Sequence, residues 1–204
     1  MKVTHILGAA PLYTNTFLIV TDQKHGILID AAAEPETYKK ALAEQGATLT
    51  HILLTHGHYD HVGAVAALRR ETGCKVYLDP ADALGNDLYP LKSSDIDEAW
   101  PVSGSLAIDE LTFTVYHTPG HTPGSVVLAL GNMLFCGDTL FAGSCGRTDM
   151  PGGSGIRMQQ SLSMLAESDL RDDAQVLPGH GESSTLGLER RSNPFMTEGM
   201  YPMY

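Results

Sequence analysis

The stretch THGHYDHVG at residues 55–63 decides the fold prediction. It follows TLTHILLT at residues 48–55, a β-branched and largely apolar run that is typical of a buried strand. Residues 62–73 come next and predict a helix with an apolar face. Four side chains in the stretch are of metal-ligand types: His56, His58, Asp60 and His61. The pattern H-x-H-x-D-H is expected by chance on the order of 10⁻⁴ times in a chain of this length.

The spacing within this stretch favours two metal ions over one. On an extended or tightly looped backbone His56 and His58 point the same way, whereas Asp60 and His61 diverge from them where the helix begins. A solvated polar loop is the alternative, but four such side chains crowded at the end of a strand are hard to satisfy with hydrogen bonds alone. The loop therefore predicts ligands for a pair of ions.

Outward from this loop the chain reads as two groups of strands, each followed by a helix. Predicted strands lie at residues 14–20, 26–30, 48–55, 75–79, 105–108, 111–117, 125–130, 133–137 and 174–179. Predicted helices lie at residues 35–46, 62–73 and 155–168, whereas residues 80–104 predict only short helix and loop. Without repeats or a dividing linker, this pattern predicts one α+β domain over residues 1–204, built from packed layers of sheet and helix.

Three more segments place a ligand-type residue after an apolar strand, among glycine and proline. They are VYHTPGHTPGS with His121, MLFCGDTLF with Asp138, and QVLPGHGES with His180. Added to the first loop, they complete one three-histidine site with His56 and His58, and a second site with Asp60 and His61. Asp138 is able to bridge the two.

The predicted ligands are imidazoles and carboxylates, with no thiolate among them. Such a set suits zinc, iron or manganese, and we expect two divalent ions, zinc first, with iron or manganese as the alternatives. Two such ions, two carboxylates and one hydroxide sum to a charge of about +1, which suits metal-assisted hydrolysis of a carbonyl compound. No serine or cysteine nucleophile is then needed.

Composition limits the class of protein and of partner. The chain has 204 residues with 43% hydrophobic residues and a net charge of −11, which is typical of a soluble globular protein. The acidic surplus argues against a nucleic-acid partner, and no apolar run is long enough to span a membrane. The first twenty residues make a poor signal peptide because Pro11, Thr14 and Asn15 interrupt them, so a cytoplasmic location is expected. Three separated cysteines indicate neither a disulfide framework nor a cysteine zinc site.

The motifs THGHYDH, TPGHTPGS, FCGDTLF and LPGHG together resemble those of the metallo-β-lactamase superfamily, over residues 15–194. The resemblance implies an αβ/βα four-layer sandwich with a binuclear metal site between the edges of two sheets. It also implies seven ligands: His56, His58, Asp60, His61, His121, Asp138 and His180. Asp30, in LIDAA, falls where the family keeps an acidic residue that orients a ligand, and the alternative is an aspartate that caps a turn at a strand end.

Within the superfamily, the segment GDTLFAGSCGRTDMPGG at residues 137–153 is similar to glyoxalase II, whose members hydrolyse glutathione thioesters such as S-lactoylglutathione. The resemblance implies that Arg147 binds the glutathione portion of the substrate. For such a hydrolase we expect Asp60 to position or receive a proton as the tetrahedral intermediate collapses. Asp149 stands where glyoxalase II has an aromatic residue, and the C-terminal helical domain of that group is missing. The chain is more similar to short single-domain glyoxalase II-like hydrolases, which share the GRTD segment and an ending like ERRSNPF at residues 189–195.

Other functions stay open at this point. Persulfide dioxygenases share the GRTD segment and bind a single iron through residues that match His56, His121 and Asp138. Lactone or phosphodiester hydrolysis would use the same metal core, with substrate choice set by loops such as residues 80–104. A metal-binding scaffold is the non-enzymatic alternative. The Met- and Tyr-rich tail at residues 195–204 suits packing on the body, a contact in a homo-oligomer, or disorder.

Overall fold

The structure, a computed structural model, describes residues 1–101 and 104–197. Contacts between Cα atoms divide the chain into two units, one of residues 1–100 and 107–112 and one of residues 101–106 and 113–204. The single domain expected over residues 1–204 stays a prediction. Most of the Met- and Tyr-rich tail lies outside the described residues. None of the helices in the described ranges has the length and apolar character that a membrane span needs.

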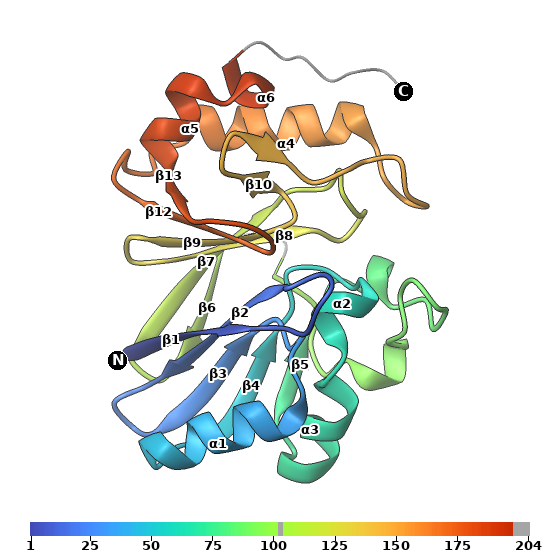
Figure 1. Cartoon of the computed structure of the whole chain (residues 1–204), viewed down its shortest axis with the longest axis vertical. Helices are drawn as coiled ribbons and strands as arrows, with labels where there is room; N and C mark the ends of the chain where they lie inside the picture. The colour runs from blue at the N-terminus through green and yellow to red at the C-terminus, as the bar shows by residue number, and fades with distance from the viewer. Residues whose placement is uncertain (102–103, 198–204) are drawn as a thin grey trace. The chain divides into compact units, whose positions relative to one another are not determined.

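The first unit is built on a five-stranded sheet (Figure 1). In spatial order its strands are β1 (Lys2–Leu7), β2 (Asn15–Val20), β3 (His25–Ile29), β4 (Thr48–Leu53) and β5 (Lys75–Tyr77). The first three strands pair antiparallel, and β3, β4 and β5 pair parallel. Because neighbouring parallel strands end at the same edge of a sheet, the loops after β3 and β4 begin side by side.

Helices α1 (Pro35–Gln45) and α3 (Val65–Thr72) pack against the sheet of the first unit (Figure 1). Tyr38 and Leu42 of α1 and Leu68 of α3 lie in one apolar cluster with β-strand residues such as Leu28 and Ile52. The helix predicted at residues 35–46 is confirmed, with Pro35 in its first turn and Gly46 in the left-handed conformation at its end.

The prediction of a single helix at residues 62–73 is wrong in one respect. The chain forms two helices, α2 (Tyr59–Val62) and α3, which are separated at Gly63 and Ala64. The amide of Ala64 donates to the carbonyl oxygen of Ala31 at 2.8 Å, and the amide of Ala31 donates to the carbonyl oxygen of His61 at 2.7 Å. These bonds to the loop after β3 replace the continuous helical ladder. Tertiary contacts therefore interrupt a segment whose apolar periodicity predicts one continuous helix.

The second unit contains most of a six-stranded sheet (Figure 1). The order of its strands is β13 (Ser184–Thr185), β12 (Gln175–Pro178), β9 (Met133–Gly137), β8 (Val126–Leu130), β7 (Leu111–His117) and β6 (Ser105–Ile108). Strands β7, β8 and β9 pair antiparallel, whereas β12 runs parallel to β9. The ends of β9 and β12 therefore lie at the same edge of this sheet.

Helices α4 (Gly155–Glu167) and α5 (Leu186–Ser192) cover one face of the second sheet (Figure 1). Met158 and Leu162 of α4 and Leu186 of α5 pack with residues such as Leu134 and Val176 of the strands. The helix predicted at residues 155–168 is confirmed, and the hydroxyl of its N-cap, Ser154, accepts from the amide of Arg157.

Several short elements were not predicted from the sequence. They are β10 (Leu140–Phe141), β11 (Ser144–Cys145), β13, α5 and α6 (Pro194–Thr197), so the strand predicted at residues 174–179 is not the last. Two-residue strands and four-residue helices are too short to show a period in the sequence. The short helix expected within residues 80–104 is present as the 3₁₀ turns η1 (Pro80–Asp82) and η2 (Ser93–Asp95).

Candidate metal centre

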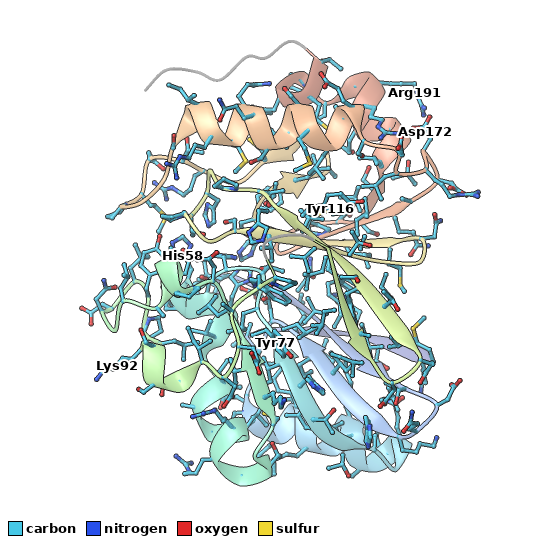
Figure 2. The ribbon with its side chains drawn as sticks, turned by 180° about the vertical axis from the view of Figure 1, so that it is seen from behind. His58, Tyr77, Lys92, Tyr116, Asp172 and Arg191 are labelled. Atoms are coloured by element: carbon cyan, nitrogen blue, oxygen red, sulfur yellow. The ribbon has the colours of Figure 1, made fainter. Side chains whose placement is uncertain are left out.

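The first unit gathers four predicted ligands on the loop after β4 and on α2. His58 is the N-cap residue of α2, and Figure 2 shows its side chain near that end of the helix. His56, His58 and His61 are at most 2% exposed. The ring centroids of His56 and His61 are 4.1 Å apart, and those of His56 and His58 are 4.8 Å apart. His61 Nε2 lies 3.7 Å from Asp60 Oδ2.

Asp30 holds this ligand loop from the end of β3. It is 2% exposed and takes a left-handed backbone conformation, with φ of 56°. Its Oδ1 accepts from the amide of Thr55 at 2.8 Å, and its Oδ2 accepts from the Thr55 hydroxyl at 2.8 Å. The same Oδ2 lies 2.8 Å from Nδ1 of His61. When Nδ1 of His61 donates to this carboxylate, the lone pair of the ring lies on Nε2, where a metal would bind. The contact favours an orienting role for Asp30 over a turn cap.

We expect Asp30→Asn to weaken metal binding about 10- to 100-fold. The amide group of asparagine is able to present N–H to Nδ1 of His61, which moves the ring proton to Nε2 and removes the lone pair from the metal side. Competition for Zn²⁺ with a chromophoric chelator measures the affinity. Asp22→Asn, at an exposed turn of the same unit, is the matched control. An Asp30→Asn variant that binds zinc as the wild type does would contradict the orienting role.

Tyr89 packs on His58 from the segment between η1 and η2. The two ring centroids are 4.7 Å apart, and Tyr89 is 2% exposed. Burial raises the pKa of Tyr89 to about 12, and the charge of Asp82 acts in the same direction. The phenol is therefore neutral at physiological pH, and it packs on the imidazole as a fixed wall. Sequence reasoning missed this residue, because a lone tyrosine in an irregular segment carries no signal.

The second unit brings together the other three predicted ligands. His121 follows β7, Asp138 follows β9 and His180 follows β12. The amide of Gly179 donates to the carbonyl oxygen of Gly137 at 2.8 Å, which locks the ends of the two parallel strands together. Asp138 and His180, one residue beyond each glycine, therefore lie side by side.

One oxygen of Asp138 lies between two imidazoles. Its Oδ2 is 3.4 Å from Nε2 of His121 and 3.6 Å from Nε2 of His180. Two donors that bind one tetrahedral ion at 2.0–2.1 Å are about 3.3 Å apart, so each of these spacings suits a carboxylate and a histidine that share an ion better than it suits a direct hydrogen bond. Asp138 is 9% exposed and His121 is 3% exposed, so the arrangement is largely shielded from solvent.

His121 is oriented by the backbone of the GRTD segment. Its Nδ1 lies 2.7 Å from the carbonyl oxygen of Arg147. A carbonyl oxygen accepts hydrogen bonds but cannot donate one, so Nδ1 is the donor. The lone pair then lies on Nε2, which faces Asp138. The sequence contains no signal for this contact, because it depends on a main-chain oxygen 26 residues away.

The side chain of Arg147 forms a two-pronged ion pair with Asp149. Nε donates to Oδ1 at 2.6 Å and Nη2 donates to Oδ2 at 2.8 Å. The hydrogen bond from Arg147 lowers the pKa of Asp149 to about 2. Both side chains are more than half exposed, so solvent screens the pair and it contributes little to stability. The predicted substrate residue thus already holds a carboxylate of its own chain.

The donor sets of the two units fit divalent metal ions. The first unit offers three histidines and a carboxylate, and the second offers two histidines and a carboxylate. His61 and His121 each direct Nδ1 to an oxygen acceptor, which is the arrangement that ligating histidines adopt. Burial raises the pKa of the Cys136 thiol to about 12, so this cysteine is a neutral thiol. A nitrogen and oxygen donor set suits zinc, iron or manganese.

Comparison with known proteins is consistent with this chemistry. Residues 9–180 match the family model described as the metallo-beta-lactamase superfamily. The hydroxyacylglutathione hydrolase GloC of Haemophilus influenzae is 33% identical over 94% of this chain and 96% of its own length. A Bacillus subtilis protein named "Probable metallo-hydrolase YqgX" is 31% identical over 93% of this chain and 95% of its own length.

Solved structures share the fold. The B3 metallo-β-lactamase BLEG-1 superposes with a TM-score of 0.84 and 32% identity, over 96% of this chain and 100% of its own. ETHE1 from Myxococcus xanthus superposes with a TM-score of 0.83 and 29% identity, over 95% of this chain and 84% of its own. TTHA1623, solved in a di-iron-bound form, superposes with a TM-score of 0.78 and 37% identity, over 94% of this chain and 99% of its own. The predicted α+β metallo-β-lactamase fold is confirmed. The chain therefore belongs to the metallo-β-lactamase superfamily of metallo-hydrolases.

Proposed function

We propose that this chain is a thioester hydrolase of the glyoxalase II type that uses two divalent ions. The ligands are His56, His58, Asp60, His61, His121, Asp138 and His180. The observation that carries the proposal is the position of Asp138 Oδ2, at 3.4 and 3.6 Å from two histidine nitrogens. A carboxylate so placed would act as a metal ligand beside both imidazoles. The 33% identity to GloC of Haemophilus influenzae supports a glutathione thioester as the substrate.

The chain's own residues have separate tasks in this proposal. Held by these ligands, two divalent ions would supply an activated water at neutral pH and an electrophile for the acyl carbonyl. Asp60, whose side chain is 15% exposed, is the proton carrier. The hydroxyl of Thr14 donates to Asp60 Oδ2 at 3.2 Å and fixes the direction of that oxygen. The carboxylate would take up the proton of the attacking water and return it to the thiolate that leaves as the tetrahedral intermediate collapses.

Arg147 is the proposed contact to the thiol half of the substrate. Its guanidinium pairs with Asp149 on the surface, where water screens the attraction between the two charges. A substrate carboxylate is therefore able to share or displace Asp149 at little energetic cost. A small-molecule substrate follows from this proposal, and a cytoplasmic location stays a prediction.

Steady-state kinetics on S-lactoylglutathione, beside a panel of lactones and phosphodiesters, test the proposed reaction. We expect the thioester to have the highest kcat/KM of the panel, and metal depletion to remove the activity reversibly. Elemental analysis of protein purified without added metal should give two ions per chain. A lactone or phosphodiester with a higher kcat/KM would replace the thioester assignment, whereas retained activity without metal would contradict the mechanism.

Persulfide dioxygenation is the second candidate function. It is favoured by the GRTD segment at residues 146–149 and by the 29% identity to ETHE1 from Myxococcus xanthus. This reaction would consume oxygen and use a single iron held by His56, His121 and Asp138. Oxygen uptake with glutathione persulfide, together with one iron per chain, would decide for it. Two ions per chain with no oxygen uptake would decide for the hydrolase.

A further inference from the structure

Asp82 is a fully buried carboxylate that contacts the turn between two proposed ligands. It lies in η1 of the first unit and is 0% exposed. Its Oδ2 accepts from the amide of Gly57 at 3.0 Å, and Gly57 stands between His56 and His58. This hydrogen bond connects Asp82 to the backbone that carries both histidines.

The contact between Asp82 and Gly57 is too close for any side chain at position 57. A Cβ atom added to Gly57 would lie 2.4 Å from the carbonyl oxygen of Asp82 and 2.7 Å from its Cβ. The glycine of the H-x-H motif is therefore needed because Asp82 lies against it, and not because of a left-handed conformation. Substitution at position 57 would force the turn and η1 apart.

Two further contacts join the same segment to the ligand loop. The amide of Tyr59 donates to the carbonyl oxygen of Leu88 at 3.0 Å. The ring of Tyr89 packs on His58 with centroids 4.7 Å apart. We call residues 79–92 the support segment, since three of its residues hold consecutive parts of the ligand loop.

We propose that Asp82 is a positioning residue, which fixes the His56–Gly57–His58 turn in the geometry that binds metal. The inference rests on the proposed function only for the ligand role of the two histidines. It assigns to part of residues 80–104 a task in metal binding, in addition to the role in substrate choice that the sequence suggested.

A carboxylate at this buried position calls for an explanation beyond packing. Burial of an ionised carboxylate is unfavourable unless hydrogen bonds compensate for it, and an apolar side chain would fill the same volume without that penalty. A charged acceptor binds an amide about twice as strongly as a neutral one, and it holds the direction of the N–H more firmly. These properties suit a turn whose two flanking side chains must point to fixed places.

The test compares zinc binding by Asp82→Ala, Asp82→Asn and Asp79→Ala, each in the full chain. Zn²⁺ alone is the probe, in competition with a chromophoric chelator, and a thermal melt of each metal-free protein reports its stability. Asp79 caps η1 by accepting from the amide of Ala81 at 2.9 Å, so its removal perturbs the same segment without touching the ligand turn. It is the matched control.

We expect zinc affinity to fall about 10- to 100-fold in Asp82→Ala and about tenfold in Asp82→Asn, which keeps the volume and an acceptor but loses the charge. Asp79→Ala should bind zinc within twofold of the wild type, although its melting temperature falls. If Asp82→Ala does not fold, the asparagine variant decides. Variants that melt at a lower temperature but bind zinc as tightly as the wild type would show a purely structural role and overturn the inference.

Failure of this inference is distinct from failure of the proposed function. A wild-type chain that binds no zinc or other divalent ion contradicts both. Zinc binding that is indifferent to Asp82 contradicts the positioning role alone. A wild-type chain that binds zinc, depends on Asp82 and hydrolyses no thioester contradicts the substrate assignment and leaves the positioning role supported.

Discussion

Asp138→Ala is expected to lower kcat/KM for thioester hydrolysis about 10³-fold. The variant removes the one carboxylate oxygen that lies within 3.6 Å of both His121 and His180. Bound ions stabilise charge in the transition state by several kcal/mol, and 1.36 kcal/mol corresponds to a factor of ten in rate, so a loss of about 4 kcal/mol gives this factor. Initial rates at saturating and limiting substrate, together with metal content, measure the effect.

Asp173→Ala is the matched control for Asp138→Ala. Asp173 belongs to the same unit, and its carboxylate pairs with Arg171 on the surface, with both side chains more than half exposed. We expect its activity to stay within twofold of the wild type. Activity of Asp138→Ala within tenfold of the wild type, with two ions still bound, would mean that this carboxylate does not hold the ions and would remove the main support for the proposed mechanism.

Glu189→Ala is expected to lower the free energy of unfolding by about 3 kcal/mol. Glu189 is 1% exposed, and its Oε2 accepts from the amide of Gly143 and from Nδ2 of Asn193, each at 2.8 Å. Its Oε1 accepts from the hydroxyl of Ser184. Loss of this acceptor is unfavourable by about 1–3 kcal/mol at the buried amide of Asn193, and the exposed Gly143 and half-buried Ser184 add less because water reaches them. Urea denaturation followed by circular dichroism measures the change.

The neighbouring Glu182 supplies the control for Glu189, because its side chain is exposed. Glu182→Ala should unfold within 0.5 kcal/mol of the wild type, as surface substitutions usually do. Glu189→Gln should fall between the two, since the amide oxygen still accepts while the amide nitrogen faces a donor. A loss below about 1 kcal/mol in Glu189→Ala would show that the three donors find water or other acceptors.

The candidate ligands could be named from sequence because they combine a residue type with a local position. A histidine or aspartate directly after an apolar strand, among glycine and proline, is a possible metal ligand by its side chain. Its position after the strand places it at the edge of a sheet. His56 and His180 are recognisable in this way without knowledge of the fold. The parallel pairing of β9 with β12 then brings Asp138 and His180 together, as strands that end at one edge must.

The residues that hold the ligands were not predictable, because their roles depend on contacts between distant segments. Asp82 is one aspartate among many in an irregular stretch. Its hydrogen bond to Gly57, 25 residues earlier, connects it to the ligand turn and is visible only in the structure. Glu189 stands in a motif shared with similar hydrolases, yet the motif alone does not reveal that its carboxylate reaches Gly143 and Ser184. The division between α2 and α3 arises in the same way, from Ala31 of another loop.

The contact between His121 and position 147 is made by a main-chain oxygen, which every amino acid possesses. Replacement of the arginine side chain therefore leaves the imidazole oriented as before. The charge, size or polarity at position 147 is therefore free to change while this contact to His121 is kept. If Arg147 binds the substrate as proposed, substrate preference is able to change at this position without loss of the proposed metal ligand.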